Sequence, residues 1–368
     1  MPTLVKEQLK VREIPVEGYE KVYAVEDPSV HLKGIICLHN LSLGPALGGI
    51  RIYPYATYED ALTDAKRLAL GMTYKSAVAG CGWGGGKSVI IADPFIHKTE
   101  GLLRSFGRAI ESLGGSYIGA EDVGCSPIDI DMMSKETKYV VGLSHEKSSG
   151  NPSYFTAWGV YRGIQAGLKK VYGSDVVKGR TIAIQGLGSV GAILADILFW
   201  NGASLIMTDI SEEKAQKIVK HYSATYCKPQ EILSAPCDVF APCALGGIIN
   251  AQTIPQLKCK IVAGAANNQL LTEVDGIEIS RRGILYAPDF VINAGGLMNV
   301  SEELSLEGYN SFKVRGKVDG LYEQLLMIFD IAEKKKISTH QAATSLGDYR
   351  LKYQIGKREA APCFHHSM

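Results

Sequence analysis

The sequence has no surplus of charge of either sign, because 39 Lys and Arg residues are balanced by 38 Asp and Glu residues. Nucleic acids and anionic membranes are bound by basic surfaces, so we expect neither as a partner. The chain has no uninterrupted apolar run of membrane-spanning length, and its first 21 residues carry charges throughout, unlike a signal peptide. We therefore expect a cytoplasmic protein.

Closely spaced cysteine pairs are missing as well. The eight cysteines include no Cys-x-x-Cys pair, the spacing that zinc sites commonly use. A disulfide framework is typical of small secreted domains rather than of a 368-residue chain. We expect reduced thiols and no metal site.

The stretch AGCGWGGGKSVIIADP, residues 79–94, lacks the first glycine of a nucleotide-binding phosphate loop. That loop needs a glycine, four residues and Gly-Lys-Ser/Thr between a strand and a helix. Counted back from Lys87, the position of the first glycine holds Cys81. The apolar run after the lysine, closed by Asp-Pro, is typical of a strand. We therefore predict a glycine loop that serves another purpose, followed by a strand.

Strand and helix patterns predict an α/β fold of two domains. Residues 33–40 and 49–55 have strand patterns, and Thr57 is placed to cap a helix that ends near residues 71–75. From residue 178 onward strands alternate with helices, which indicates a doubly wound parallel sheet. The loop-forming run 144–152 marks the expected boundary. We expect an α/β domain over residues 1–147, a Rossmann-type doubly wound domain over 148–334, and helices 335–368 that pack back on the first domain.

The second domain contains a dinucleotide fingerprint, G-x-G-x-x-G, at Gly186, Gly188 and Gly191. An apolar strand precedes it, an apolar helix follows, and Asp209 ends the next strand. In such a unit the first glycine makes a tight turn, the second lets a pyrophosphate approach, and the third packs helix on strand. The carboxylate of Asp209 would accept from a ribose 2′-hydroxyl and repel a 2′-phosphate, which favours NAD over NADP as the cofactor.

Two plainer interpretations stay open at this fingerprint. The glycines alone can form an ordinary strand-to-helix turn, although the context favours the dinucleotide site. Asp209 can also serve as a cap of the helix that begins near Ser211.

Eight segments together resemble a known family. They are GPALGGIRIYPY, RLALGMTYKSAVAGCGWGGGKSVIIADP, YIGAEDVG, SSGNPS, QGLGSVG, APCALGG, GAANNQL and APDFVINAGG. The chain is similar to the NAD-dependent amino acid dehydrogenases of the glutamate, leucine, phenylalanine and valine group, and within it above all to the leucine dehydrogenases. The resemblance implies a homo-oligomer, often an octamer, with a small amino acid as substrate. It also implies that a cleft separates the two domains and that the first domain, residues 1–147, binds the substrate and carries the oligomerisation surfaces.

The resemblance implies three charged groups at the reaction centre. Lys75 would bind the substrate α-carboxylate, Lys87 would be catalytic, and Asp122 would handle protons at the substrate amine. Two ammonium groups in a closed cleft repel, so we expect the pKa of one lysine to be lowered toward neutrality, where it can act as a general base. From spacing alone, each residue has an ordinary alternative: a helix-terminal lysine, a solvated lysine at a strand start, and an exposed acidic pair with Glu121.

The resemblance also implies a side-chain pocket built from Leu47, Ala120, Leu297 and Val300. The glutamate-specific relatives have a lysine at the first position and a serine at the last, whereas both are apolar here. Burying an unpaired carboxylate against them would cost several kcal/mol. A branched aliphatic amino acid such as L-leucine therefore fits best, although plain core packing explains any one of these residues equally well.

Further contacts follow from the same resemblance. Those to substrate are assigned to Gly48, Gly49 and Asn293. Those to the cofactor are assigned to Ser189, Val190, Thr156, Cys243, Ala244 and Asn267. Two rival functions stay open: a phenylalanine or tryptophan dehydrogenase of the same mechanism, and a non-catalytic NAD-binding regulatory protein on this fold.

Overall fold

The computed structural model describes residues 8–145 and 148–365 and divides the chain into two units. The first comprises Met1–Asn151, Val300–Asn310 and Arg350–Met368, and the second comprises Pro152–Asn299 and Ser311–Tyr349. The expected domain boundary lies between residues 147 and 148, and residue 147 is outside the described residues. The chain returns to the first unit at Arg350 and not near residue 335, and residues 300–310 add a segment that the sequence pattern did not predict.

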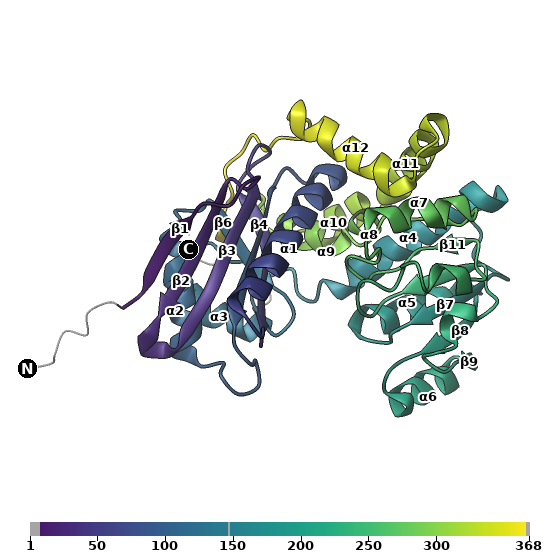
Figure 1. Ribbon diagram of the computed structural model, residues 1–368, viewed down its shortest axis with the longest axis horizontal. Coiled ribbons are helices and arrows are strands. Elements are labelled where there is room, and N and C mark those ends of the chain that lie inside the picture. The colour runs from purple at the N-terminus through teal and green to yellow at the C-terminus, as the bar shows by residue number, and fades with distance from the viewer. Residues whose placement is uncertain (1–7, 146–147, 366–368) are drawn as a thin grey trace, which may run out of the picture. The chain divides into compact units, whose positions relative to one another are not determined.

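The first unit is built on a six-stranded mixed sheet in the order β1-β2-β3-β5-β4-β6 (Figure 1). Its strands are β1 (Lys10–Ile14), β2 (Lys21–Asp27), β3 (Leu32–Asn40), β4 (Ala46–Tyr53), β5 (Gly84–Ile91) and β6 (Tyr117–Glu121). The long helix α1 (Tyr58–Ala79) packs on one face with its alanines. Helices α2 (Glu100–Glu111) and α3 (Pro127–Ser134) contribute to the core on the other face.

Helix α1 begins as predicted but ends later. The Thr57 side chain accepts the N–H of Asp60, and the helix runs to Ala79 before Gly80 takes a left-handed φ of 66°. Gly71, where the sequence pattern predicted the end, lies inside the helix. A single glycine in a helix interior costs only about 1 kcal/mol, so favourable neighbours carry the helix through it. Lys75 therefore lies inside α1, and the prediction of a helix-terminal lysine is wrong.

The expected glycine loop is also a strand. Gly84, Gly85 and Gly86 form the first half of β5, which pairs antiparallel with β3 and parallel with β4. A Cβ on Gly85 would lie 2.0 Å from Thr73 Oγ1 of α1. The glycines are needed because the helix and the neighbouring strands approach the backbone of β5 too closely for side chains.

The second unit is a doubly wound parallel sheet in the order β12-β11-β10-β7-β8-β9. Its strands are β7 (Thr181–Gln185), β8 (Ser204–Thr208), β9 (Thr225–Tyr226), β10 (Val239–Pro242), β11 (Ile261–Val262) and β12 (Leu285–Tyr286). Its helices are α4 (Ser153–Tyr172), α5 (Ser189–Trp200), α6 (Glu212–His221), α7 (Glu273–Arg281), α8 (Asp289–Ile292), α10 (Ser311–Asp319), α11 (Leu321–Lys335) and most of α12 (Thr339–Lys352). Among the described residues, no helix is both long and apolar enough to cross a bilayer.

The segment 300–310 is held in the first unit by a buried carboxylate. Helix α9 (Gly295–Glu302) runs across the division between the units, and Glu303 follows it. The Glu303 carboxylate accepts from the N–H groups of Gly142 and Ser149 and from Ser148 Oγ. The sequence gives no local signal for this anchor, because its partners lie more than 150 positions away in the chain.

Candidate active site

Lys87 and Asp122 meet in the first unit. Lys87 is the fourth residue of β5, and Asp122 follows the last residue of β6. Lys87 Nζ lies 2.9 Å from Asp122 Oδ2, and the lysine is only 4% exposed. A lysine is almost never this buried without a partner. The alternatives of a solvated lysine and an exposed acidic pair therefore do not hold for Lys87 and Asp122.

A second cation, Arg51, shares the same carboxylate oxygen. Arg51 Nε donates to Asp122 Oδ2 at 2.8 Å, and its Nη1 donates to Asp64 Oδ2 at 2.9 Å. The Tyr55 hydroxyl donates to that oxygen of Asp64 at 2.5 Å. The result is a connected chain of charges, Lys87–Asp122–Arg51–Asp64, on the face of the sheet that α1 covers.

Glycine at position 49 makes room for this cluster. A Cβ on Gly49 would lie 2.8 Å from Asp122 Cβ and 2.9 Å from Lys87 Nζ. The neighbouring Gly48 faces the other way, where a Cβ would lie 1.8 Å from the Gly86 carbonyl oxygen. Gly48 thus serves strand packing, whereas the bare surface of Gly49 leaves the lysine and the aspartate in contact.

The charges of this cluster and its burial shift the pKa values of Lys87 and Asp122. Burial lowers the pKa of Lys87 and the guanidinium of Arg51 lowers it further, while the carboxylate of Asp122 opposes both. Burial acts to raise the pKa of Asp122, but the ammonium of Lys87 and the guanidinium of Arg51 outweigh it and hold this pKa below the ordinary aspartate value. The expected direction for Lys87 is confirmed. The largest cause is burial, and the guanidinium of Arg51 adds to it.

The other predicted residues of the first unit lie around this sheet. Lys75 is half-buried in α1, one turn before its end. Leu47 lies in β4 and Ala120 in β6, and both are buried. Val300 lies in α9 and is also buried, one turn after Leu297 of the second unit.

The glycine turn of the second unit has the expected geometry. Gly186 has a φ of 93°, and a Cβ on Gly191 would lie 2.0 Å from the Gly186 carbonyl oxygen. Gly188, the N-cap of α5, has nothing within 4 Å of the position of a Cβ. Ser189 and Val190 form the first turn of α5. Since open space lies over Gly188 at a helix N-terminus, the turn fits a phosphate group.

Asp209 is tied to this turn. Its Oδ2 accepts the N–H of Leu187 at 2.7 Å, and its Oδ1 accepts the N–H of Ser211 at 3.0 Å. Ser211 is itself the N-cap of α6. The helix cap is therefore Ser211, whose hydroxyl accepts the N–H of Lys214, and the capping alternative for Asp209 is wrong. The Asp209 carboxylate instead holds the glycine turn and the residue before α6 in place.

Two asparagines of the second unit lie side by side. Asn293 Nδ2 donates to Asn267 Oδ1 at 2.8 Å and to the carbonyl of Ala265 at 3.1 Å. Asn293 Oδ1 is buried and has no hydrogen-bond partner among the described residues. A buried acceptor without a partner costs about 1–3 kcal/mol, so a further hydrogen-bond donor at Asn293 Oδ1 would be stabilising.

Thr156, Cys243 and Ala244 also have defined places. Thr156 Oγ1 donates to the carbonyl of Pro152 in the first turn of α4. The Cys243 N–H donates to the Gln185 carbonyl at 2.7 Å, and burial raises the pKa of its thiol to about 11. The Cβ of Ala244 is the atom nearest to a Cβ built on Gly186, at 2.8 Å. Cys243 and Ala244 thus border the glycine turn.

Sequence reasoning missed two residues that hold the lysine site. Arg51 stands two positions after Gly49 in a strand, and this period-2 spacing was a usable signal that both face the same side. Tyr117 is fully buried and donates to the Gly48 carbonyl at 2.9 Å and to Ser88 Oγ at 3.0 Å. It supports β4 and β5 from the opposite face, and no local pattern pointed to it.

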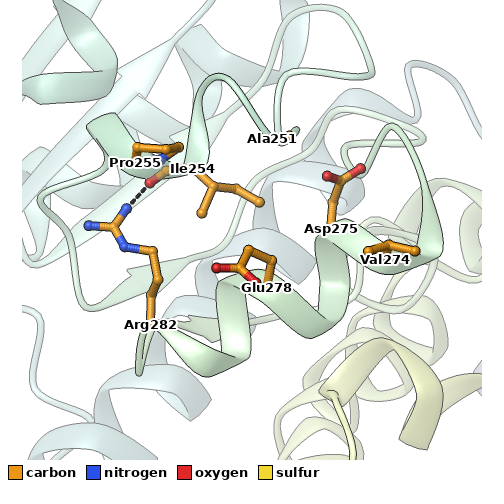
Figure 2. Close-up of a pocket in the computed structure, with 7 residues that line it drawn as sticks. All are labelled: Ala251, Ile254, Pro255, Val274, Asp275, Glu278 and Arg282. Atoms are coloured by element: carbon orange, nitrogen blue, oxygen red, sulfur yellow. Dashed lines mark hydrogen bonds between the residues drawn. The ribbon is translucent and has the colours of Figure 1, made fainter.

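Two hollows of the second unit are lined by residues outside the predicted set. One has a volume of about 560 Å³, and its lining residues are Ala251, Ile254, Pro255, Val274, Asp275, Glu278 and Arg282 (Figure 2). In Figure 2 the Arg282 side chain points to the carbonyl of Ile254, to which it donates. Asp275 caps α7 by accepting from Thr272. These two polar groups are already used within the protein. The other hollow, of about 420 Å³, lies between α4, α5 and α10.

Comparison with known proteins identifies the family. Residues 20–139 match the model of the Glu/Leu/Phe/Val dehydrogenase dimerisation domain, and residues 205–347 match that of Glutamate/Leucine/Phenylalanine/Valine dehydrogenase. A leucine dehydrogenase of Thermoactinomyces intermedius is 48% identical over 334 residues, which cover 90% of this chain and 91% of that protein. This chain belongs to the glutamate, leucine, phenylalanine and valine dehydrogenase family. It is an amino acid dehydrogenase of the kind that uses a nicotinamide cofactor.

Other members of the family are nearly as similar. A phenylalanine dehydrogenase of Caldalkalibacillus thermarum is 45% identical, with 91% of this chain and 92% of that protein covered. The crystal structure of L-tryptophan dehydrogenase from Nostoc punctiforme matches with a TM-score of 0.79 at 43% identity, covering 91% of this chain and 96% of that one. The two-domain α/β fold is thereby confirmed, whereas relatives named for three different amino acids leave the substrate open.

Proposed function

We propose that this dehydrogenase catalyses the reversible, NAD-dependent oxidative deamination of L-leucine and related branched-chain amino acids to 2-oxo acids, with release of ammonia. The observation that carries this proposal is the buried contact of 2.9 Å between Lys87 Nζ and Asp122 Oδ2. A lysine with a lowered pKa beside a carboxylate supplies the base and the proton carrier that deamination needs.

The chain's own residues divide the work as follows. Lys75 binds the substrate α-carboxylate, and Asp122 moves protons at the substrate amine. NAD, when bound, accepts a hydride from the substrate Cα. Lys87 then takes a proton from the water that attacks the resulting iminium carbon, and ammonia leaves. The free Oδ1 of Asn293 and the small surface of Gly49 are the further contacts we assign to the substrate.

A branched aliphatic side chain suits the apolar residues Leu47, Ala120, Leu297 and Val300. All four are buried, and none can pair with a second carboxylate. Leu297 stands where leucine dehydrogenases tend to have valine, which adds one methylene to the wall. A single methylene changes selectivity by roughly 1–3 kcal/mol, so it shifts preference among apolar substrates without admitting glutamate.

NAD rather than NADP suits the second unit, which we take as the cofactor domain. The open space at Gly188 accommodates a pyrophosphate at the N-terminus of α5, and Ser189 and Val190 supply its backbone N–H groups. The carboxylate of Asp209 is fixed beside this turn, where it would repel a 2′-phosphate. Thr156, Cys243, Ala244 and Asn267 complete the contacts we assign to the cofactor.

The test is to follow NADH or NADPH absorbance with a panel of L-amino acids. We expect the highest kcat/KM with L-leucine and NAD. Turnover with L-phenylalanine or L-tryptophan but not with branched amino acids would select the aromatic alternative. Binding of NAD without turnover of any amino acid would select the regulatory alternative, and a preference for NADP would contradict the role of Asp209.

The dimerisation-domain match suggests that the protein is an oligomer. We propose that the first unit carries the substrate-binding and oligomerisation surfaces, that the assembly is an octamer, and that it works in the cytoplasm. Measuring the mass of the purified protein by light scattering checks the oligomer size.

A further inference from the structure

We propose that Asp289 is a positioning residue that holds Asn267 in place for the cofactor, an inference that depends on the proposed function. No role has so far been assigned to Asp289, which begins α8 and is buried. Its Oδ2 accepts the backbone N–H of Asn268 at 2.6 Å, and its Oδ1 accepts the Tyr286 hydroxyl at 2.9 Å. A buried carboxylate that receives a backbone N–H fixes that peptide more firmly than a neutral acceptor.

The two ends of α8 fasten the same loop. Asp289 reaches the Asn268 N–H, and Asn293, four residues later, reaches the Ala265 carbonyl and the Asn267 side chain. Residues four apart lie on one face of a helical turn, so both side chains can point at the loop 265–268. The loop is thus held at its first and last residues by one short helix.

Next to these attachments, the backbone N–H and the backbone carbonyl of Asn268 both form hydrogen bonds. Asn268 takes a left-handed φ of 51°, an uncommon and costly conformation for a residue other than glycine. Its carbonyl accepts the Gly247 N–H at 2.8 Å while its own N–H is held by Asp289. Such a conformation persists only where its surroundings enforce it, and the Asp289 carboxylate is one of the groups that enforce it here.

Asn267 stands out from this fixed backbone. It is exposed, whereas Ala266 before it and Gln269 after the loop are buried. The Ala266 N–H donates to the Pro242 carbonyl at 2.9 Å, which ties the loop to the end of β10. Since both neighbours of Asn267 are pinned, its side chain is presented in one position without being buried itself. We infer that loss of Asp289 loosens this position and weakens cofactor binding.

Asp289→Ala is the direct test, with NAD affinity measured by calorimetry on the chain without substrate and KM for NAD measured in turnover. We expect the dissociation constant and KM for NAD each to rise roughly tenfold, in line with the loss of one charge-assisted hydrogen bond. Hydrogen exchange of the segment 265–269 should become faster in the variant without NAD. Asp289→Asn keeps the volume and one acceptor oxygen, so it should give a smaller rise and also reports if the alanine variant fails to fold.

Asp275 supplies the matched control. It is equally buried, at 6%, in the same unit, and its Oδ2 accepts from the Thr272 N–H at 2.8 Å and from Thr272 Oγ1 at 2.7 Å. Asp275→Ala should lower the melting temperature and leave NAD affinity unchanged. The inference is overturned if both Asp289 variants bind NAD and exchange like the wild type, or if Asp275→Ala weakens NAD binding equally. A wild type that binds NAD but turns over no amino acid would instead refute the proposed function.

Discussion

Two glycine clusters, one in each unit, look alike in the sequence and do different things in the structure. In the first unit, Gly84, Gly85 and Gly86 are buried in a strand, and a Cβ on each would lie within 3.0 Å of another protein atom. In the second unit, Gly188 is exposed at a helix N-terminus with nothing within 4 Å of a Cβ. The first cluster exists so that protein can approach protein, and the second leaves room for something that is not protein.

The difference shows how each unit presents its chemistry. In the first unit Lys87, which follows the glycines, contacts Asp122 in a buried position beside the bare surface of Gly49, and desolvation changes the pKa of the lysine. The open turn presents backbone N–H groups, which need no pKa change to bind a phosphate. On the proposed function, the missing side chains would serve proton chemistry in the first unit and cofactor binding in the second. The predictions below separate the two.

Lys87→Ala should have the largest effect. Removing a general base typically costs about 10²–10⁴-fold in rate, so we expect turnover of L-leucine to fall by about 10³-fold or more while NAD affinity stays as in the wild type. Lys98→Ala is the control, because Lys98 also pairs with a carboxylate of the first unit, Asp129, at 2.7 Å. Wild-type rates in Lys87→Ala, or an equal loss in Lys98→Ala, would refute the assignment.

Gly49→Ala should have the next largest effect. Its methyl group would displace Lys87 Nζ or Asp122 from their contact, since both lie within 3.0 Å of the new atom. A misplacement of about 1 Å at a reaction centre can cost about 10²-fold, and we expect kcat to fall by that order with KM for NAD unchanged. Steady-state kinetics decide the point, and an altered KM for NAD at normal kcat would contradict it.

Gly188→Ala should give the opposite pattern. The methyl group enters open space at a φ of −66°, which alanine adopts freely, so stability should change by no more than about 1 kcal/mol. The space is then lost to the pyrophosphate, and we expect KM for NAD to rise roughly tenfold with kcat little changed. If affinity for NAD is unaffected, the open turn is not the cofactor site.

Gly71→Ala should have the smallest effect and should stabilise the protein. Gly71 lies inside α1 with nothing within 4 Å of its Cβ position, so no described residue would clash with an alanine there. Replacing glycine by alanine inside a helix gains about 0.5–1 kcal/mol. Urea unfolding measures this gain, and a loss of stability or of activity would show that the glycine has a use that its surroundings do not reveal.

The sequence predicted best where the signal is local. The strand Thr181–Gln185, the glycine turn and the helix after it follow one another without a break, and the structure has them where the pattern placed them. The end of β6 at Glu121, directly before Asp122, was equally readable, because an apolar run stops at an acidic pair. Such features depend on neighbours in the chain.

The sequence predictions failed where contacts between residues far apart in the chain determine the local structure. Gly85 is in a strand because Thr73 of α1 packs on it, and no pattern around Gly85 contains that information. Arg51 meets Asp122 because β4 pairs with β6, so that Ile50 lies opposite Glu121. Helix α1 continues through Gly71 and ends at Ala79, where Gly80 forms the left-handed C-cap. Each case required the register or the packing of the sheet.

The pH dependence of kcat/KM for L-leucine tests the central claim most directly. Lys87 must be neutral to act as a base, and its pKa is lowered by burial and by Arg51, so activity should rise with pH along a limb below the ordinary lysine value of about 10.4. Arg51→Gln removes a positive charge beside Lys87, and the Asp122 carboxylate then forms its ion pair with Lys87 without competition from Arg51. Both changes raise the pKa of Lys87, so the limb should move to higher pH. A wild-type limb near the ordinary lysine value, or one that stays in place in Arg51→Gln, would contradict the account.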